Sequence, residues 1–342
     1  MQESESRWRK IALSGGAIIG AAAAYNAFAR KGVDLLTNLI GGEEGGFEWR
    51  GSRIAFTRRG SGPPMLLVHG IHPAAWSYEW HDNVDALART NTVYTIDLLG
   101  FGRSDRPAIR YSARLYISLI SDFVHQVIGE PCVLVASSLS GAYAIVLAAR
   151  DPQRFPAIAL IAPTGLIRLN KTAGVGGEAG RLAVETPIVG TAMFNTLVAH
   201  RNLRRWLEKT YADDTIVTDD LVDIYYWTAH QRGARHAPAA FISGHLNIDV
   251  RQALRRLTQP ALLIWGEEGS ATPIEEFRGF RAVKPDLELS VLTPAGDLPH
   301  DERPDDFNVI LSTWLTRLSL SSAPTRDMLP GTPEVSQPTS QL

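Results

Sequence analysis

The chain has 342 residues, of which 45% are hydrophobic and 20% are charged, and its formal net charge is −2. This composition is typical of a globular protein with one large domain or two small ones. The near-neutral charge argues against a nucleic-acid-binding protein that works through a basic face. The single cysteine, Cys132, excludes an internal disulfide framework and a cysteine-rich zinc site.

The N-terminal segment, residues 1–45, contains an uncharged run from residue 11 to residue 29 with basic residues on both sides. The run is long enough for a membrane-spanning helix. It also fits a signal peptide, because Ala27-Phe28-Ala29 resembles a cleavage site. A third reading is an alanine-rich helix of a soluble protein. We expect a membrane-anchored or exported protein, and the slight excess of basic residues before the run favours a catalytic domain outside the cytoplasm.

Apolar runs that end in small or turn-forming residues predict buried strands. They are Met65–His69, Thr92–Leu98, Cys132–Ser137, Ile158–Ala162, Ala261–Trp265 and Leu287–Leu292. Phe47–Arg59 alternates like a pair of strands that turn near Gly51-Ser52. Helical patterns lie between the strands at Tyr78–Ala88, Ala113–Ile128 and Leu139–Ala149. This alternation predicts an α/β fold with a doubly wound, mostly parallel sheet.

The segment 165–258 interrupts this alternation, because it holds helical patterns with large apolar side chains and no good strand. An insertion between two strands of such a sheet predicts a helical cap over the carboxyl ends of the strands, where ligands bind. The core would then comprise residues 46–164 and 259–319. Residues 320–342 are rich in Ser, Pro and Thr and predict a disordered tail.

The stretch CVLVASSLSG, from Cys132 to Gly141, predicts a strand that runs directly into a helix. A nucleophile at such a turn needs small residues two positions away on each side. Ser138 meets this requirement, with Ala136 before it and Ser140 after it. Ser140 is itself a second candidate for the nucleophile. The usual G-x-S-x-G pattern is A-x-S-x-S in this chain.

The stretch LLVHGIH ends an earlier strand and predicts an oxyanion loop. A backbone N–H from this loop and the N–H after the nucleophile can together hold a developing oxyanion. We expect Ile71 and Leu139 to supply these two donors. The sequence has no dinucleotide-binding or phosphate-binding loop and no convincing pair of metal ligands, so we expect no cofactor and no metal.

These motifs resemble those of the α/β-hydrolase superfamily, in its form with a serine nucleophile and a helical cap, from about residue 47 to residue 318. The resemblance is carried by LLVHGIH, DLLGFGRSDRP, VASSLSG, LLIWGEE and AGDLPHDERPDDF. It implies hydrolysis of an ester, thioester, lactone, amide or carbon–carbon bond. It also implies an acid after a late strand and a histidine near the end of the chain.

Both partners of the serine are absent from the places that the resemblance implies. Gly269 stands at the position of the acid, and Asp297 stands at the position of the histidine. Glu268, one residue before the expected position, is the candidate for the displaced acid. Removal of the base from such a triad typically lowers kcat on the order of 10⁶-fold. Asp297 could accept the serine proton only weakly, unless burial raised its pKa.

Three histidines are alternatives for the missing base. His300 lies three residues after the expected position and would need a reshaped loop to reach the serine. His245 lies where the cap returns to the sheet, and His72 lies beside the oxyanion loop, so either could point into the site and contact substrate.

We therefore expect a Ser138-dependent hydrolase with a relocated base, His300 in first place. Its expected substrate is an ester-like bond of a hydrophobic small molecule, because the cap is rich in apolar groups. The alternative is a non-catalytic α/β-hydrolase scaffold that binds a hydrophobic ligand or a protein partner through the same pocket. We expect no nucleic-acid partner, and contact with a membrane through the N-terminal segment.

Overall fold

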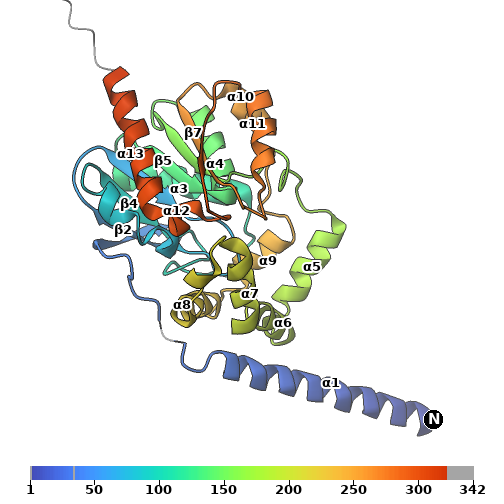
Figure 1. Ribbon diagram of the computed structural model, residues 1–342. Coiled ribbons are helices and arrows are strands. Elements are labelled where there is room, and N and C mark those ends of the chain that lie inside the picture. Colours follow the sequence, from blue (N-terminus) through green and yellow to red (C-terminus); the bar gives the residue numbers. More distant parts are fainter. Residues whose placement is uncertain (1, 34, 322–342) are drawn as a thin grey trace, which may run out of the picture.

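The computed structural model describes residues 2–33 and 35–321 and contains a single eight-stranded sheet (Figure 1). The strands are β1 (Glu43–Trp49), β2 (Ser52–Arg59), β3 (Pro64–Val68), β4 (Thr92–Ile96), β5 (Val133–Ser137), β6 (Ile158–Ile161), β7 (Ala261–Gly266) and β8 (Glu288–Leu292). Their order in the sheet is β1-β2-β4-β3-β5-β6-β7-β8. β2 is antiparallel to β1 and to β4, and the other neighbours are parallel. The predicted α/β fold is thus confirmed.

Each apolar run that was predicted as a buried strand overlaps an observed strand. The opening pair is also confirmed, since Trp49 pairs with Ser52 across a two-residue turn. Arg50 and Gly51 both have positive φ in this turn, at 50° and 77°, as a tight hairpin requires. β1 begins earlier than the alternation indicated, because its first residues, Glu43-Glu44-Gly45-Gly46, include no large apolar side chain.

Helices cover both faces of the sheet, and the alternation along β3 shows how. Leu66 and Val68 belong to a core cluster shared with α3 (Ala113–Phe123) and α4 (Ser138–Arg150). Met65 and Leu67 point to the opposite face, where they join a cluster with α2 (Val84–Leu87) and α13 (Pro304–Ser321). Because successive side chains of a strand point to opposite faces, an all-apolar strand such as β3 is buried on both.

Two predicted helices have a different form. The segment predicted as Tyr78–Ala88 consists of a 3₁₀ helix (Ser77–Trp80) and the short α2. In the segment predicted as Ala113–Ile128, α3 ends at Phe123 and a π-helical turn, Val124–Ile128, continues to Gly129. Gly129 has a φ of 77°, which stops the helix. Cys132 follows closely and is buried beside the start of β5.

A helical insertion between β6 and β7 lies over the carboxyl ends of the strands. It contains α5 (Val175–Glu185), α6 (Val189–Leu197), α7 (His200–Thr210), α8 (Asp219–Ala229), α9 (His236–Ile242) and α10 (Arg251–Arg256). Its own apolar core includes Phe194, Leu207 and Tyr225, and is joined by Ala74 and Leu298 from loops of the sheet. These two contacts fix the insertion, which we call the cap, above the loops that carry the site.

The long helix α1 (Gln2–Ala29) points away from the body and meets the cap toward its C-terminal end (Figure 1). The Asn26 side-chain amide donates to the Ile188 carbonyl oxygen at 2.8 Å and accepts from the Asn195 amide at 3.0 Å. The Tyr226 hydroxyl donates to the Ala29 carbonyl oxygen at 2.6 Å. Among the helices that the structure describes, none combines the length and hydropathy of a membrane-spanning segment.

The predicted tail, residues 320–342, lies outside the described residues except for residues 320 and 321, which end α13. After β7, the chain forms a 3₁₀ helix (Ile274–Glu276) and α11 (Phe277–Val283), and α12 (Pro299–Glu302) precedes α13.

Candidate active site

Ser138 occupies a sharp turn between a strand and a helix. It follows directly on β5 and is the first residue of α4, with a φ of 51°. A non-glycine residue rarely adopts this left-handed backbone, whose strain persists only where the surrounding structure enforces it. Ser140 is fully buried instead, and its hydroxyl donates to the His69 carbonyl oxygen at 2.6 Å. The geometry therefore favours Ser138 over Ser140 as a nucleophile.

Ser138 lines a cavity of about 330 Å³ between the strand ends and the cap. Much of its wall is apolar and comes from the oxyanion loop, the end of β6, the cap and the loop before α12. These apolar residues are Ile71, Pro73, Ala162, Leu169, Trp206, Phe241 and Leu298. Such a cavity suits the non-polar part of a small molecule.

The oxyanion loop lies close against the turn that carries Ser138. A Cβ atom on Gly70 would lie 3.2 Å from Ser137 Oγ and 3.5 Å from Ser138 Cβ, so the absence of a side chain at Gly70 allows this close approach without a shift. The N–H of Ile71 donates no hydrogen bond to any described residue. Leu139 is the second residue of α4, so its N–H has no carbonyl partner within the helix. Both N–H groups are thus available to a ligand oxygen.

Glu79 binds the oxyanion loop on the side away from the cavity, a role that no sequence motif indicated. The Gly70 N–H donates to both of its carboxylate oxygens, at 3.1 and 3.0 Å. Burial alone would raise the pKa of Glu79, but contact with His300 and the nearby His69 hold that pKa below its usual value. The buried carboxylate therefore stays ionised and fixes the backbone beside Ile71.

Asp297 lines the same cavity, and its side chain is bound to the loop after β7. The backbone N–H groups of Ala271 and Thr272 donate to its carboxylate at 2.9 to 3.1 Å. The N–H and the hydroxyl of Ser270 donate to it at 3.2 and 3.3 Å. The carboxylate thus joins the two loops that the resemblance expects to carry the histidine and the acid.

Glu268 does not reach the cavity. Its exposed side chain accepts a hydrogen bond from the Ala295 N–H at 2.8 Å. A Cβ atom on the neighbouring Gly269 would lie 3.2 Å from Asp297 Oδ1. Gly269, at the position expected for the acid, therefore lies next to Asp297 but has no side chain of its own.

His300 is not among the residues that line the cavity. It is fully buried in α12, where its ring lies 4.2 Å from the ring of Trp80 and its Nε2 lies 3.3 Å from Glu79 Oε1. The Asn83 amide binds the His300 backbone oxygen at 2.9 Å and fixes this placement. The structure therefore brings His300 to Glu79, behind the oxyanion loop, and not into the cavity with Ser138.

His245 also lies outside the cavity. Its Nδ1 is 2.8 Å from the Ser243 hydroxyl, and its Nε2 is 3.0 Å from a carboxylate oxygen of Glu178. Both nitrogens thus have partners within the cap. The contacts anchor α5 to the segment after α9.

His72 is the histidine that the structure places in the cavity, among the residues it describes. Its ring lies 4.5 Å from Trp206 and 5.9 Å from Tyr225. The Ala74 N–H donates to its Nδ1 at 3.4 Å, so in the neutral ring the proton is on Nε2. Burial lowers the pKa of His72 to about 4. His72 therefore contributes a neutral hydrogen-bond donor at pH 7.

Thr164 and Arg168 are two further polar residues of the cavity that no sequence motif indicated. The Thr164 hydroxyl is buried without a hydrogen-bond partner. The Arg168 Nε donates to Glu276 at 2.5 Å. Both follow β6, and only the fold brings this loop beside Ser138. Among the described residues, no group of three or more His, Cys, Asp or Glu side chains is placed to hold a metal ion.

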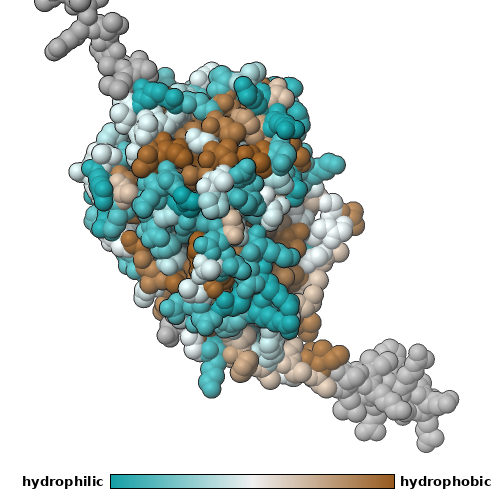
Figure 2. Space-filling view, viewed as in Figure 1, coloured by the Kyte–Doolittle hydropathy of each residue, from teal (hydrophilic) through white to brown (hydrophobic). Residues whose placement is uncertain are grey.

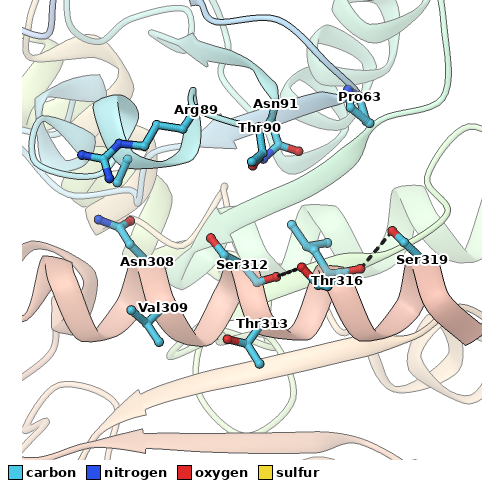
Figure 3. Close-up of a pocket in the computed structure, with 12 residues that line it drawn as sticks. Pro63, Arg89, Thr90, Asn91, Asn308, Val309, Ser312, Thr313, Thr316 and Ser319 are labelled. Atoms are coloured by element: carbon cyan, nitrogen blue, oxygen red, sulfur yellow. Dashed lines mark hydrogen bonds between the residues drawn. The ribbon is translucent and has the colours of Figure 1, made fainter.

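A second hollow lies between α13 and the segment before β4 (Figure 3). Pro63 precedes β3 and Asn91 precedes β4, so this hollow is at the amino ends of the strands. The hydroxyls of Thr316 and Ser319 donate to carbonyl oxygens of their own helix. Ligands of open α/β sheets bind at the opposite edge, and so the cavity at Ser138 is the candidate site.

Comparisons with known proteins agree with this arrangement. A model described as the alpha/beta hydrolase family matches residues 65–309. A 2-hydroxymuconate semialdehyde hydrolase from Pseudomonas sp. strain CF600 is 26% identical over 236 residues, which cover 66% of this chain and 77% of that protein.

Solved structures extend the similarity. A meta-cleavage product hydrolase from Pseudomonas fluorescens IP01 is 22% identical, with a TM-score of 0.66, and the match covers 82% of this chain and 100% of that chain. A protein described as a membrane phospholipase A is 21% identical, with a TM-score of 0.65, and the match covers 93% of this chain and 99% of that chain. At these identities the solved structures show a common fold.

Proposed function

Because the chain belongs to the alpha/beta hydrolase family, we propose that it is a slow serine hydrolase that cleaves an ester-like bond of a hydrophobic small molecule. The observation that carries this proposal is the strained φ of Ser138 at the mouth of a largely apolar cavity. Relatives named as hydrolases of small organic molecules support the reaction class.

In the proposed reaction, Ser138 Oγ attacks the carbonyl carbon, and the N–H groups of Ile71 and Leu139 stabilise the resulting oxyanion. The neutral His72 donates its Nε2 proton in a hydrogen bond to the substrate. The acyl–oxygen bond to the leaving group then breaks and leaves an ester on Ser138, which water hydrolyses. This assigns His72 to substrate binding.

We propose that Asp297 accepts the proton of the Ser138 hydroxyl, because it provides the one carboxylate among the described residues of the cavity. Its carboxylate would take the proton as Oγ attacks and return it to the leaving group. His300, the base first expected, lies behind Glu79. A carboxylate is a weaker base than the imidazole of a complete triad, and we therefore expect turnover far below that of such a triad.

Labelling with a fluorophosphonate probe tests this function. We expect the folded protein to be labelled, Ser138→Ala to lose the label and Ser140→Ala, the matched control two residues away, to keep it. Asp297→Ala should label more slowly. Absence of labelling between pH 6 and 9 in protein shown to be folded would refute the activated serine.

The placement of Asp297 also supports a second candidate, a non-catalytic scaffold that binds a hydrophobic ligand. Its carboxylate occupies the histidine position and is engaged with three consecutive backbone N–H groups. If the protein is such a scaffold, apolar small molecules should bind saturably and Ser138→Ala should leave their affinity unchanged. The fluorophosphonate probe should then not label Ser138.

We also propose that the N-terminal segment anchors the protein to a membrane or directs its export, with the cavity outside the cytoplasm. The uncharged run from residue 11 to residue 29 supports this. So do the large apolar side chains that α1 leaves exposed, Ile18, Ile19 and Phe28.

A further inference from the structure

A cavity of about 210 Å³, separate from the one at Ser138, lies where the end of α1 meets the cap. Its lining is strongly cationic and, among the residues that the structure describes, includes no aspartate or glutamate. The polar residues that matter here are Arg30, Thr191, Asn195, His230, Arg232 and Arg235. We call this cavity the junction site.

The three arginines of the junction site, Arg30, Arg232 and Arg235, form no ion pair among the described residues. The Nε of Arg235 is buried without any hydrogen-bond partner, and burial lowers the pKa of this arginine. Glu185 of α5 attracts the Arg235 guanidinium electrostatically, but the Glu185 carboxylate is bound to Arg181. Arg235 is partly buried, whereas Arg30 and Arg232 are exposed at the rim of the cavity. A partly buried guanidinium group without a counter-charge is costly, and an anionic ligand would offset that cost.

His230 adds a buried polar atom to the same site. Its side chain belongs to a residue that is 2% exposed, and its Nδ1 lies 2.9 Å from the Tyr226 carbonyl oxygen. Nδ1 must therefore carry a proton, and Nε2 of the neutral ring is an acceptor. Nε2 is buried and has no partner. The site thus offers several strong donors and one acceptor to a ligand.

The end of α1 completes the site, because Arg30 follows directly on this helix. Its position is fixed by the bonds of Asn26 to α6 and by the bond of the Tyr226 hydroxyl to Ala29. Two exposed apolar side chains belong to the segments that meet here, Phe28 of α1 and Ile188 beside α6. Hydrophobic residues are visible along the part of α1 next to the cap (Figure 2).

We propose that the junction site binds a phosphate group through the guanidinium groups of Arg30, Arg232 and Arg235. Phosphate oxygens match the planar fork of arginine, and several arginines together suit a group with more than one anionic oxygen. A hydroxyl on the ligand, either on the phosphate or on an adjoining glycerol, would donate to His230 Nε2. The phosphate belongs either to a soluble compound or to the headgroup of an anionic lipid.

Two assays on the full chain distinguish these sources. Calorimetric titration with inorganic phosphate measures the affinity of the chain for a soluble phosphate. Co-sedimentation with vesicles measures its affinity for a lipid headgroup. The vesicles contain phosphatidylcholine alone or with one quarter phosphatidylglycerol. The variants are Arg232→Gln, whose side chain is exposed, and the double variant Arg232→Gln/Arg235→Gln. The control is Arg255→Gln, an exposed arginine on α10 that removes the same charge.

We expect phosphate affinity to fall at least tenfold in Arg232→Gln and not in Arg255→Gln. An equal loss of binding to phosphatidylglycerol vesicles would identify a lipid headgroup, whereas unchanged vesicle binding would identify a soluble phosphate compound. If the double variant does not fold, Arg232→Gln alone decides the question. The proposal fails if both ligands bind Arg232→Gln as they bind Arg255→Gln. Fluorophosphonate labelling of Ser138 reports on the proposed hydrolase separately.

Discussion

The carboxylate of Asp297 is joined to the backbone of Ala271, whose N–H lies 3.0 and 2.9 Å from its two oxygens. This single side chain connects the last loop of the sheet to the loop after β7. A histidine and an acid would make the corresponding connection in a complete triad. One aspartate therefore retains the connection between the two loops without the imidazole of such a pair.

The first prediction concerns stability. Asp297→Ala leaves the N–H groups of Ser270, Ala271 and Thr272 without their acceptor, and we expect unfolding free energy to fall by about 2–3 kcal/mol. Urea denaturation monitored by tryptophan fluorescence measures this. Asp286→Ala is the control, because that carboxylate is exposed and pairs with Lys284 on the surface. Equal stability of the two variants would contradict a connecting role.

The second prediction concerns a restored triad. The double variant Gly269→Asp/Asp297→His places an acid and a histidine at the expected positions. Gly269 does not have a positive φ, and the nearest atom to an added Cβ, Asp297 Oδ1 at 3.2 Å, belongs to the residue replaced. The Cβ would also lie 3.3 Å from the backbone oxygens of Gly266 and Thr272, so this loop must shift by a few tenths of an ångström. We expect kcat/KM on a p-nitrophenyl ester to rise at least a hundredfold, because the base of a triad contributes on the order of 10⁶ in kcat.

Gly269→Asp/Asp297→Ala is the control for that experiment and should show no gain. A folded double variant without increased turnover would mean that Ser138 and residue 297 are not aligned for proton transfer.

The third prediction concerns His72. His72→Phe removes a donor that faces the cavity, so KM should rise about tenfold, which corresponds to roughly 1.4 kcal/mol, with a smaller effect on kcat. Since the pKa of His72 is about 4, its ring stays neutral as the pH falls from 8 to 5. The effect of the substitution on KM should therefore be constant over that range. If the effect of His72→Phe on KM instead changed with a midpoint near pH 6.5, the His72 ring would be an exposed imidazole with an ordinary pKa.

The fourth prediction concerns the pH dependence of stability. Asp301 is buried between His81 and the Tyr211 hydroxyl, and burial raises its pKa to about 6. The native state therefore binds this proton more tightly than the unfolded state does. The contribution of Asp301 to stability is full below about pH 4 and is lost as the pH rises to about 6.

Asp301→Asn removes this penalty. We compare the unfolding free energies of the variant and the wild type by urea titration at pH 4 and at pH 8. The difference in favour of the variant should be about 2–3 kcal/mol larger at pH 8 than at pH 4. Asp305→Asn, an exposed change on α13, should show no such gain. If the difference in unfolding free energy between the wild type and Asp301→Asn is the same at both pH values, the Asp301 carboxyl has an ordinary pKa.

The fifth prediction concerns location. The full chain should sediment with membranes, and a chain that lacks residues 1–31 should remain in the supernatant. A mature N-terminus after Ala29 in the exported protein would identify a signal peptide instead. Recovery of the full, uncleaved chain in the supernatant would contradict both alternatives.

The strands and the nucleophile turn were predictable because their causes are local. A run such as Leu66-Leu67-Val68 has no polar side chain for solvent, and small residues around Ser138 permit its strained φ. The absence of a histidine at position 297 was equally visible in the motif. These features depend on composition over a few residues.

The environment of His300 was not predictable, because it depends on segments far apart in the chain. Its partners Glu79 and Trp80 lie in a 3₁₀ helix that the periodicity had indicated as part of a longer α-helix. Similarly, no motif marks Glu79 as the acceptor for the Gly70 N–H. Contacts of this kind follow from the docking of α12 on the loops and not from any pattern within it.

The burial of Cys132 has a practical consequence for spectroscopy. It is the one thiol of the chain, and burial raises its pKa to about 12, which suppresses the reactive thiolate at neutral pH. A cysteine introduced on α1 or on the cap would therefore take up a maleimide dye or a spin label alone. Distances between pairs of such labels would report how α1 sits on the cap in solution, without removal of the native residue.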